Sequence, residues 1–155
     1  MAIEIERKYL LKDDSWRKLA AKGSVYSQGY MATKNVQKPR VRLAGNTGYL
    51  TIKGAIVGCS RFEFEYTIPI NDAKEILHNL CEKPLIEKIR YKVEWGDLTW
   101  EIDEFDGENK GLILAEVELK DENQTIELPP WIGKEVSDNP KYYNFNLVKH
   151  PFTRW

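Results

Sequence analysis

The sequence has no long apolar run and few cysteines. No apolar stretch in its 155 residues approaches the ~20 residues of a membrane-spanning helix, and the charged N-terminus lacks the apolar region of a signal peptide. Cys59 and Cys81 have neither CxxC nor zinc-site spacing, which is typical of reduced thiols. His78 and His150 have no third ligand at metal spacing. These absences predict a cytoplasmic protein that does not bind membranes.

An excess of charge of one sign is also lacking. The chain has 23 lysines and arginines against 24 aspartates and glutamates, with a net charge of -1. No overall field therefore favours DNA, RNA or an anionic membrane, and nucleic acid is not an expected partner. Because 42% of the residues are hydrophobic and no linker or repeat interrupts the chain, residues 1–155 are expected to form a single domain.

What the sequence does have is alternation of apolar and polar residues, which is the period of a β-strand. Helical patterns fill the gaps between the strands, so the expected class is α+β. One short helix should follow Asp14 and end at Gly23, and another should follow Asn71 or Asp72. Two further short helices are expected at 131–136 and 141–149. The expected strands are 3–11, 26–33, 38–44, 48–54, 60–68, 86–95, 98–106 and 112–120.

The register of one hairpin is defined by its turn. Gly96-Asp97 is a favoured two-residue loop, so Trp95 should face Leu98. The same register sets Lys88 opposite Phe105, a poor match that suggests a bulge. It also gives two charged pairs on one face and two apolar pairs on the other: Arg90 with Asp103, Lys92 with Glu101, Tyr91 with Ile102, and Val93 with Trp100.

Charged residues of one sign repeat at alternate strand positions, where they share a face roughly 6 to 7 Å apart. A solvated sheet face is the ordinary explanation of such charges. A solvated surface, however, intersperses the two signs, because like charges repel. Repulsion of this kind is tolerated where a ligand cancels it. The rows are Glu4 and Glu6 with Lys8, Arg40 and Arg42, Thr51 and Lys53, Glu63 and Glu65, Lys88 and Arg90, and Glu116 and Glu118.

Eight antiparallel strands suit closure into a barrel with room for one small ligand, which also removes exposed edges. If the apolar face of the sheet were turned inward, the charged rows would lie on the outside of the barrel and would only contact solvent. The aromatic residues on the opposite face, such as Phe62, Phe64 and Trp100, favour outer walls that are covered by helices. We therefore expect an eight-stranded barrel with a charged lumen, apolar residues turned away from that lumen, and helices packed on the outside.

A lumen with separate basic and acidic rows matches a polyphosphate and its divalent metal. Arginine and lysine bind phosphate oxygens, and carboxylate clusters bind hard cations such as Mg²⁺ or Mn²⁺. Paired carboxylates also serve glycosidases, but that chemistry leaves the basic residues without a role. A substrate rich in carboxylates stays open at this point.

These residues resemble a known family. Glu4-x-Glu6-x-Lys8 is the ExExK pattern of the CYTH superfamily, also called triphosphate tunnel metalloenzymes, and the later pairs follow in that family's order. The resemblance covers essentially the whole chain, and the stretch Gln28-Gly29-Tyr30 is most similar to the bacterial inorganic triphosphatase branch. It implies an antiparallel tunnel and a metal-dependent phosphohydrolase that converts inorganic triphosphate (tripolyphosphate) to pyrophosphate and phosphate, with Mg²⁺ or Mn²⁺.

Other activities stay open within and outside this family. Its members include class IV adenylate cyclases and triphosphatases that act on thiamine triphosphate or RNA. A noncatalytic protein that binds polyphosphate or nucleotide is an alternative of another class. The apolar outer wall also leaves a homodimer open.

Roles for the charged residues follow from their chemistry. The first and last strands should meet on closure and supply metal ligands, and Asp103 should either bind metal or hold Arg90. Glu63 and Glu65 could bind the metal or orient water, and Lys8 could contact phosphate or position the attacking water. Tyr30 resembles a tyrosine proposed as a proton acceptor in relatives, although a phenol with a pKa near 10 is a poor base. The expected metal ligands are Glu4, Glu6, Glu116, Glu118 and Asp103; the expected triphosphate ligands are Lys8, Arg40, Arg42, Lys53, Lys88 and Arg90; the catalytic candidates are Lys8, Tyr30, Glu63 and Glu65.

Overall fold

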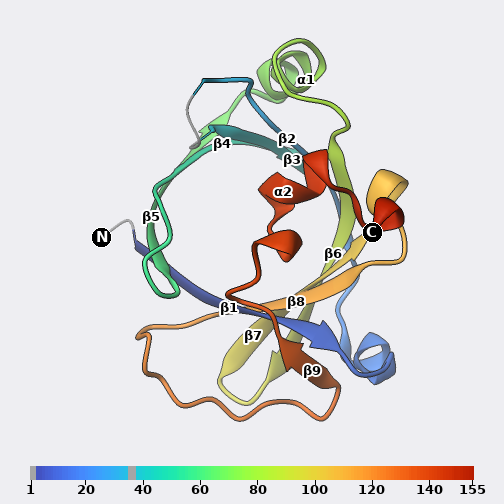
Figure 1. The fold of residues 1–155 in the computed structure, drawn as a ribbon. Helices are drawn as coiled ribbons and strands as arrows, with labels where there is room; N and C mark the ends of the chain where they lie inside the picture. The colour runs from blue at the N-terminus through green and yellow to red at the C-terminus, as the bar shows by residue number, and fades with distance from the viewer. Residues whose placement is uncertain (1–2, 35–37) are drawn as a thin grey trace.

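In the computed structural model, which describes residues 3–34 and 38–155, one antiparallel sheet closes on itself (Figure 1). Its strand order is β5-β4-β3-β2-β6-β7-β8-β1-β9, and β1 also pairs with β5. This second pairing closes an eight-stranded barrel, as the sequence predicted, and β9 extends it. The strands are β1 (Ile3–Leu11), β2 (Ser24–Tyr30), β3 (Arg40–Ala44), β4 (Thr47–Lys53), β5 (Ser60–Ile68), β6 (Ile86–Trp95), β7 (Leu98–Phe105), β8 (Ile113–Glu118) and β9 (Ile132–Glu135).

The prediction of a helix at 131–136 is wrong, because this segment forms β9. Only residues Ile3 to Ile5 of β1 pair with β5, so the rest of that edge is left to be filled. Strand β9 occupies it, placing Glu135 opposite Tyr9 and Ile132 opposite Leu11. An otherwise open strand edge is thereby covered.

The helices lie both outside the barrel and at one end of it. Helix α1 packs on the outer faces of β3 and β4, where its Ala73 and Leu77 bury Val41. The helix expected to end at Gly23 is a single short 3₁₀ turn that ends at Leu19. None of the helices in the described ranges is long and apolar enough to cross a membrane. The helical elements are η1 (Ser15–Leu19), α1 (Ile70–Asn79), η2 (Gly107–Asn109), η3 (Pro140–Tyr142), α2 (Asn144–Lys149) and η4 (Phe152–Arg154).

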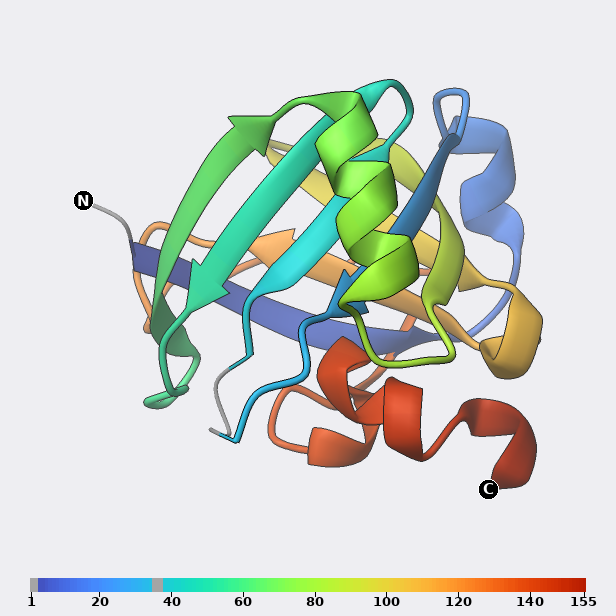
Figure 2. The same cartoon turned by 90° about the horizontal axis from the view of Figure 1, so that it is seen from above.

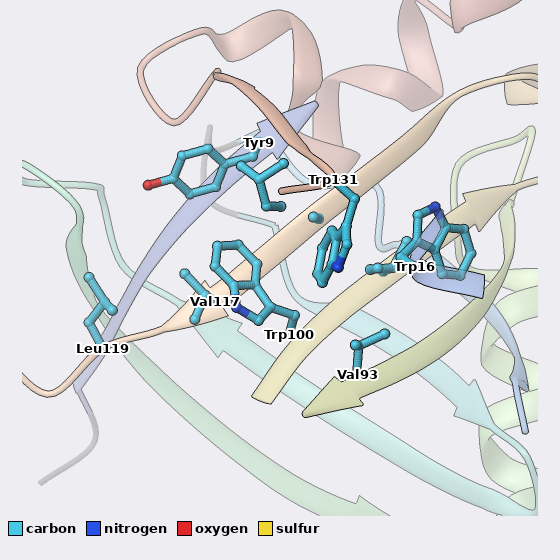
Figure 3. Packing of buried hydrophobic residues seen from close by; sticks show 10 residues of the cluster. Tyr9, Trp16, Val93, Trp100, Val117, Leu119 and Trp131 are labelled. Carbon is cyan, nitrogen blue, oxygen red and sulfur yellow. The ribbon is translucent and has the colours of Figure 1, made fainter. Parts of the chain in front are cut away.

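The largest apolar core lies outside the barrel wall (Figure 3). Val93, Trp100 and Val117 project outward from β6, β7 and β8, where Trp16 of η1 and Trp131 beside β9 cover them. The ring centroids of Trp100 and Trp131 are 5.8 Å apart in an edge-to-face arrangement, which is a favourable geometry for aromatic pairs. The outward-facing aromatic residues of these strands are therefore covered, as expected.

A second apolar core closes one end of the barrel, and it corrects the expectation that apolar residues turn away from the lumen. Tyr30, Phe105 and Leu114 continue the lumen-facing positions of their strands, and they pack against Leu147 and Val148 of α2. Figure 2 shows the C-terminal segment (residues 136–155) lying across this end. Helix α2 therefore closes the tunnel at one mouth, whereas the sequence had placed it on the outer wall.

The predicted hairpin register is confirmed from Trp95 opposite Leu98 to Lys88 opposite Phe105, with all four matched pairs in place. There is no bulge at Phe105, because its ring belongs to the core at the closed end. The Lys88 ammonium lies 5.5 Å from the centroid of that ring, within range of a cation–π contact.

Candidate active site

The charged rows line one cavity of about 620 Å³ inside the barrel, a volume that suits a small molecule. Every site residue expected from the sequence lines this cavity except Asp103, which is buried behind Arg90 and Lys88. The lining residues of that set are Glu4, Glu6, Lys8, Tyr30, Arg40, Arg42, Lys53, Glu63, Glu65, Lys88, Arg90, Glu116 and Glu118.

The register of β1 with β8 explains why the expected carboxylates meet. Glu6 lies opposite Glu118, and Lys8 lies opposite Glu116. Because directly opposite residues in an antiparallel pair have Cβ atoms about 5 Å apart, two carboxylates face each other at the first of these positions. The expected meeting of the first strand with strand 112–120 is confirmed.

Two of the four glutamates are paired with cations. Glu4 lies 3.0 Å from the Lys53 ammonium and 3.4 Å from Arg61. Burial alone would raise the pKa of Glu4, but Lys53, with Arg61, lowers it to about 2. Glu116 is likewise buried, and Lys8 at 3.3 Å is the main cause of a pKa well below the ordinary value.

The other two glutamates, Glu6 and Glu118, differ in this respect. Within the described part of the chain, neither Glu6 nor Glu118 makes an ion pair. Burial raises the pKa of Glu6 well above its ordinary value, and Glu116 and Glu4 raise it further. The pKa of Glu118 is also raised, by burial and then by Glu4. For these two carboxyl groups, burial and neighbouring carboxylates outweigh the stabilisation of the ionised form by lysines.

The described residues do not form a ready-made metal cage. No three aspartate, glutamate, histidine or cysteine side chains among them converge closely enough to hold a metal ion. Two of the candidate carboxylates are engaged in ion pairs, Glu4 with Lys53 and Glu116 with Lys8. Metal coordination by this set would require these pairs to exchange.

Asp103 organises two of the basic residues. Its carboxylate accepts hydrogen bonds from Arg90 Nε at 2.7 Å and Nη2 at 2.8 Å, and from Lys88 Nζ at 2.8 Å. Burial would raise the pKa of Asp103, but Arg90 and Lys88 lower it to about 2. Burial lowers the pKa of Lys88 to about 7, although Asp103 opposes this shift. The predicted contact of Asp103 with Arg90 is confirmed.

On the neighbouring strands, β3 supplies two arginines with unequal partners. Arg40 donates to Thr51 at 3.2 Å and lies 3.6 Å from Glu65. Arg42 donates only to the neutral side chain of Gln28, at 2.9 Å, among the described residues. Burial, together with Arg40 and Arg90, lowers the pKa of Arg42 to about 10. Arg42 is therefore charged at neutral pH and lacks a counter-ion in the described structure.

The C-terminal segment supplies lumen contacts that the sequence pattern did not reveal. The Asn144 side-chain oxygen accepts hydrogen bonds from Lys88 at 3.0 Å and from Gln28 at 3.3 Å. The backbone carbonyl of Tyr142 accepts one from Lys8 at 3.3 Å. Tyr30, at the same end, packs edge-to-face on Phe145. Only the tertiary fold brings this segment to the tunnel, so no local signal could have identified it.

Comparison with known proteins agrees with this geometry. The model of the CYTH domain family matches residues 2–149. The chain is 51% identical to an inorganic triphosphatase of Acetivibrio thermocellus over 98% of its own length and 97% of that protein. It is 36% identical to an inorganic triphosphatase of Nitrosomonas europaea, covering 94% and 96% of the two chains.

Solved structures show the same architecture. An inorganic triphosphatase structure superposes with a TM-score of 0.68 at 29% identity, over 96% of this chain and 95% of that one. A Pyrococcus horikoshii protein of 16% identity has a TM-score of 0.61 over 77% and 80% of the two chains, and it shares the fold. On the strength of the family match, which spans nearly the whole sequence, this chain belongs to the CYTH domain family.

Proposed function

We propose that this protein hydrolyses inorganic triphosphate to pyrophosphate and phosphate inside its tunnel. The observation that carries the proposal is the group formed by Arg42, Arg40 and Arg90, in which Arg42 has no carboxylate partner among the described residues. A highly charged anion would relieve the repulsion within this group. The two curated relatives, both inorganic triphosphatases, support the same substrate.

The basic residues would bind the substrate's phosphates as follows. Arg40, Arg42 and Arg90 offer planar guanidinium groups to phosphate oxygens, and Lys8, Lys53 and Lys88 add point charges. Their shared task is to neutralise charge in the transition state, which is the main catalytic requirement of phosphoryl transfer. We assign Asp103 to positioning Arg90 and Lys88, because both of its oxygens are engaged by them.

For the divalent metal, Mg²⁺ or Mn²⁺, we propose Glu6 and Glu118 as the primary ligands, with Glu4 and Glu116 completing the set. Two facing carboxylates with raised pKa values and no cation partner among the described residues are a fitting donor set for a hard cation. When bound, the metal would supply positive charge to the phosphate chain.

The remaining catalytic candidates receive roles by position. Glu63 contacts Lys53 at 2.9 Å and Glu65 accepts from Thr51 at 3.1 Å, so both are placed to orient basic residues or water. Lys8 lies close to Glu116 and is proposed to position the attacking water. Tyr30 stays a candidate proton acceptor at the closed end.

The proposal is tested by phosphate release from tripolyphosphate, ATP and thiamine triphosphate, each with Mg²⁺ and with Mn²⁺. Rapid release from tripolyphosphate with either metal, and none in the presence of a chelator, is the expected result. Cyclic AMP formed from ATP would instead identify a cyclase. Tight binding of tripolyphosphate without phosphate release would identify a noncatalytic binding protein.

We also propose a homodimer that forms through the outer face of β5. Phe62, Phe64 and Tyr66 are 61%, 44% and 56% exposed there, which leaves roughly 300 Å² of aromatic surface open if a whole side chain counts about 200 Å². Ile3 and Ile52 adjoin them through the strand register and are also exposed. Apolar patches of about this size are often functional, and the lack of charge in this one lets it meet a second copy of itself at the centre of an interface of ~800 Å² per partner.

Phe62→Glu is expected to convert the dimer to a monomer in light scattering coupled to size-exclusion chromatography. Leu128→Glu, at an exposed apolar residue in the loop between β8 and β9, is the matched control and should leave the mass unchanged. A monomeric wild-type protein at high micromolar concentration would contradict the proposed dimer.

A cytoplasmic location is proposed as well. Cys59 and Cys81 are free thiols, which fits a reducing compartment. Residues 1–155 are proposed to form one domain, in line with the extent of the family match.

A further inference from the structure

We propose that Tyr26 is a positioning residue whose ring holds both Arg42 and Arg90 and presents them to one phosphate chain. This inference rests on the proposed function. The carbon at the centre of each guanidinium lies 5.0 Å from the centroid of the Tyr26 ring. No other ring in the described structure contacts two cations at such distances.

The strand register explains this arrangement. Tyr26 lies on β2 between β3 and β6, directly opposite Ala44 on one side and Lys88 on the other. Arg42 and Arg90 each lie two residues from those partners, on the same lumen-facing side. Diagonal neighbours of this kind are within reach of aromatic and long side chains. One ring can therefore contact an arginine of each flanking strand.

The chemistry of the ring suits this position. Arg42 and Arg90 repel each other, and Arg90 is one of the charges that lower the pKa of Arg42, after burial and Arg40. A carboxylate at position 26 would hold both arginines but would cancel the charge needed to bind phosphate. The aromatic face attracts guanidinium groups through its quadrupole and has no net charge. Tyr26 thus holds two like charges without adding a negative charge of its own.

The ring face, and not the hydroxyl group, is expected to hold the two arginines. Among the described residues the Tyr26 hydroxyl makes no hydrogen bond, whereas both arginines lie over the ring. Arg42 also donates to Gln28, and Arg90 donates to Asp103 and Glu101, so each guanidinium has further partners besides the ring. Loss of the ring should loosen the arginines without removing these contacts.

The test compares Tyr26→Phe and Tyr26→Leu with the wild type. Val25→Ala, at an exposed residue on the outer face of the same strand, is the matched control. Calorimetric titration with metal-free tripolyphosphate measures binding without turnover, and steady-state kinetics give KM and kcat separately.

Tyr26→Leu should weaken binding by about tenfold, the size expected from losing desolvated cation–π contacts. Its KM should rise more than its kcat falls. Tyr26→Phe and Val25→Ala should stay within about twofold of the wild type on the same grounds.

Each outcome is informative. Unchanged binding by Tyr26→Leu overturns the inference, and equal losses in Tyr26→Phe and Tyr26→Leu would assign the role to the hydroxyl group instead. If thermal unfolding shows that Tyr26→Leu does not fold, Tyr26→Met replaces it, because methionine is also an uncharged side chain without an aromatic ring. Wild-type protein that binds tripolyphosphate but does not hydrolyse it overturns the proposed function, while the binding series still tests Tyr26. Wild-type protein that does not bind tripolyphosphate overturns both.

Discussion

Arg42→Ala is expected to lower kcat/KM for inorganic triphosphate by about 10³-fold, the lower range for loss of an arginine that stabilises phosphoryl transfer. The melting temperature should not fall. Arg42 is disfavoured in its charged form by burial and by Arg40 and Arg90, so removing it relieves repulsion in the empty protein. The variant loses the hydrogen bond to Gln28 and the contact with the Tyr26 ring, which we expect to be smaller effects.

The measurement combines phosphate release with thermal unfolding. Arg17→Ala is the control, because Arg17 pairs with Glu104 on the outer surface and should turn over substrate at the wild-type rate. An Arg42→Ala protein that is fully active with excess Mg²⁺ would contradict the assignment of the tunnel as the active site.

Glu6→Gln is expected to raise the melting temperature by a few degrees and to abolish metal-dependent turnover. Glu6 faces Glu118 and lies near Glu4 and Glu116, with no cation partner among the described residues. Its folded-state pKa is raised, so its ionised form lowers the free energy of unfolding above that pKa. Below the ordinary value of 4.5, both states are protonated and this penalty disappears. The stabilisation by glutamine should therefore be full only well above the raised pKa, where Glu6 is ionised in both states, and should vanish as the pH falls toward 4.5.

Glu4→Gln provides the matched contrast two residues away. The pKa of Glu4 is lowered from 4.5 to about 2, so its ionised form stabilises the fold above 4.5, and this stability is lost as the pH falls through about 2. Glu4→Gln should thus be less stable than the wild type at neutral pH, and the difference should shrink as the pH falls toward 2 and vanish below it. Urea unfolding of both variants across this pH range tests both predictions, namely that Glu6→Gln raises the free energy of unfolding and that Glu4→Gln lowers it. A stability loss in Glu6→Gln would show that Glu6 has a cation partner in solution.

The sequence predicted the parts of the fold that depend on alternation and turn chemistry. The lumen rows and the β6–β7 register follow from strand period and from Gly96-Asp97, and both are confirmed. The closed end was missed although its residues share the lumen-facing positions. The one signal was Phe105 opposite Lys88, which was interpreted as a bulge but marks the apolar core under α2.

The remaining differences arise from contacts between distant segments. Strand β9 forms because an edge of β1 is free, and residues 131–136 carry no sign of that in their own sequence. Asn144 reaches Lys88 only because the C-terminal segment lies across the barrel. Tyr26 faces two arginines because β2 lies between β3 and β6, an order that the sequence did not define.

The central claim is that the charged lumen is the binding site for triphosphate. A crystal structure of the protein soaked with tripolyphosphate and Mg²⁺ tests it most directly. Density for the phosphate chain beside Arg40, Arg42 and Arg90, with a metal at Glu6 and Glu118, is the expected result. A tunnel holding only water, with the phosphates bound at the outer surface, would contradict it.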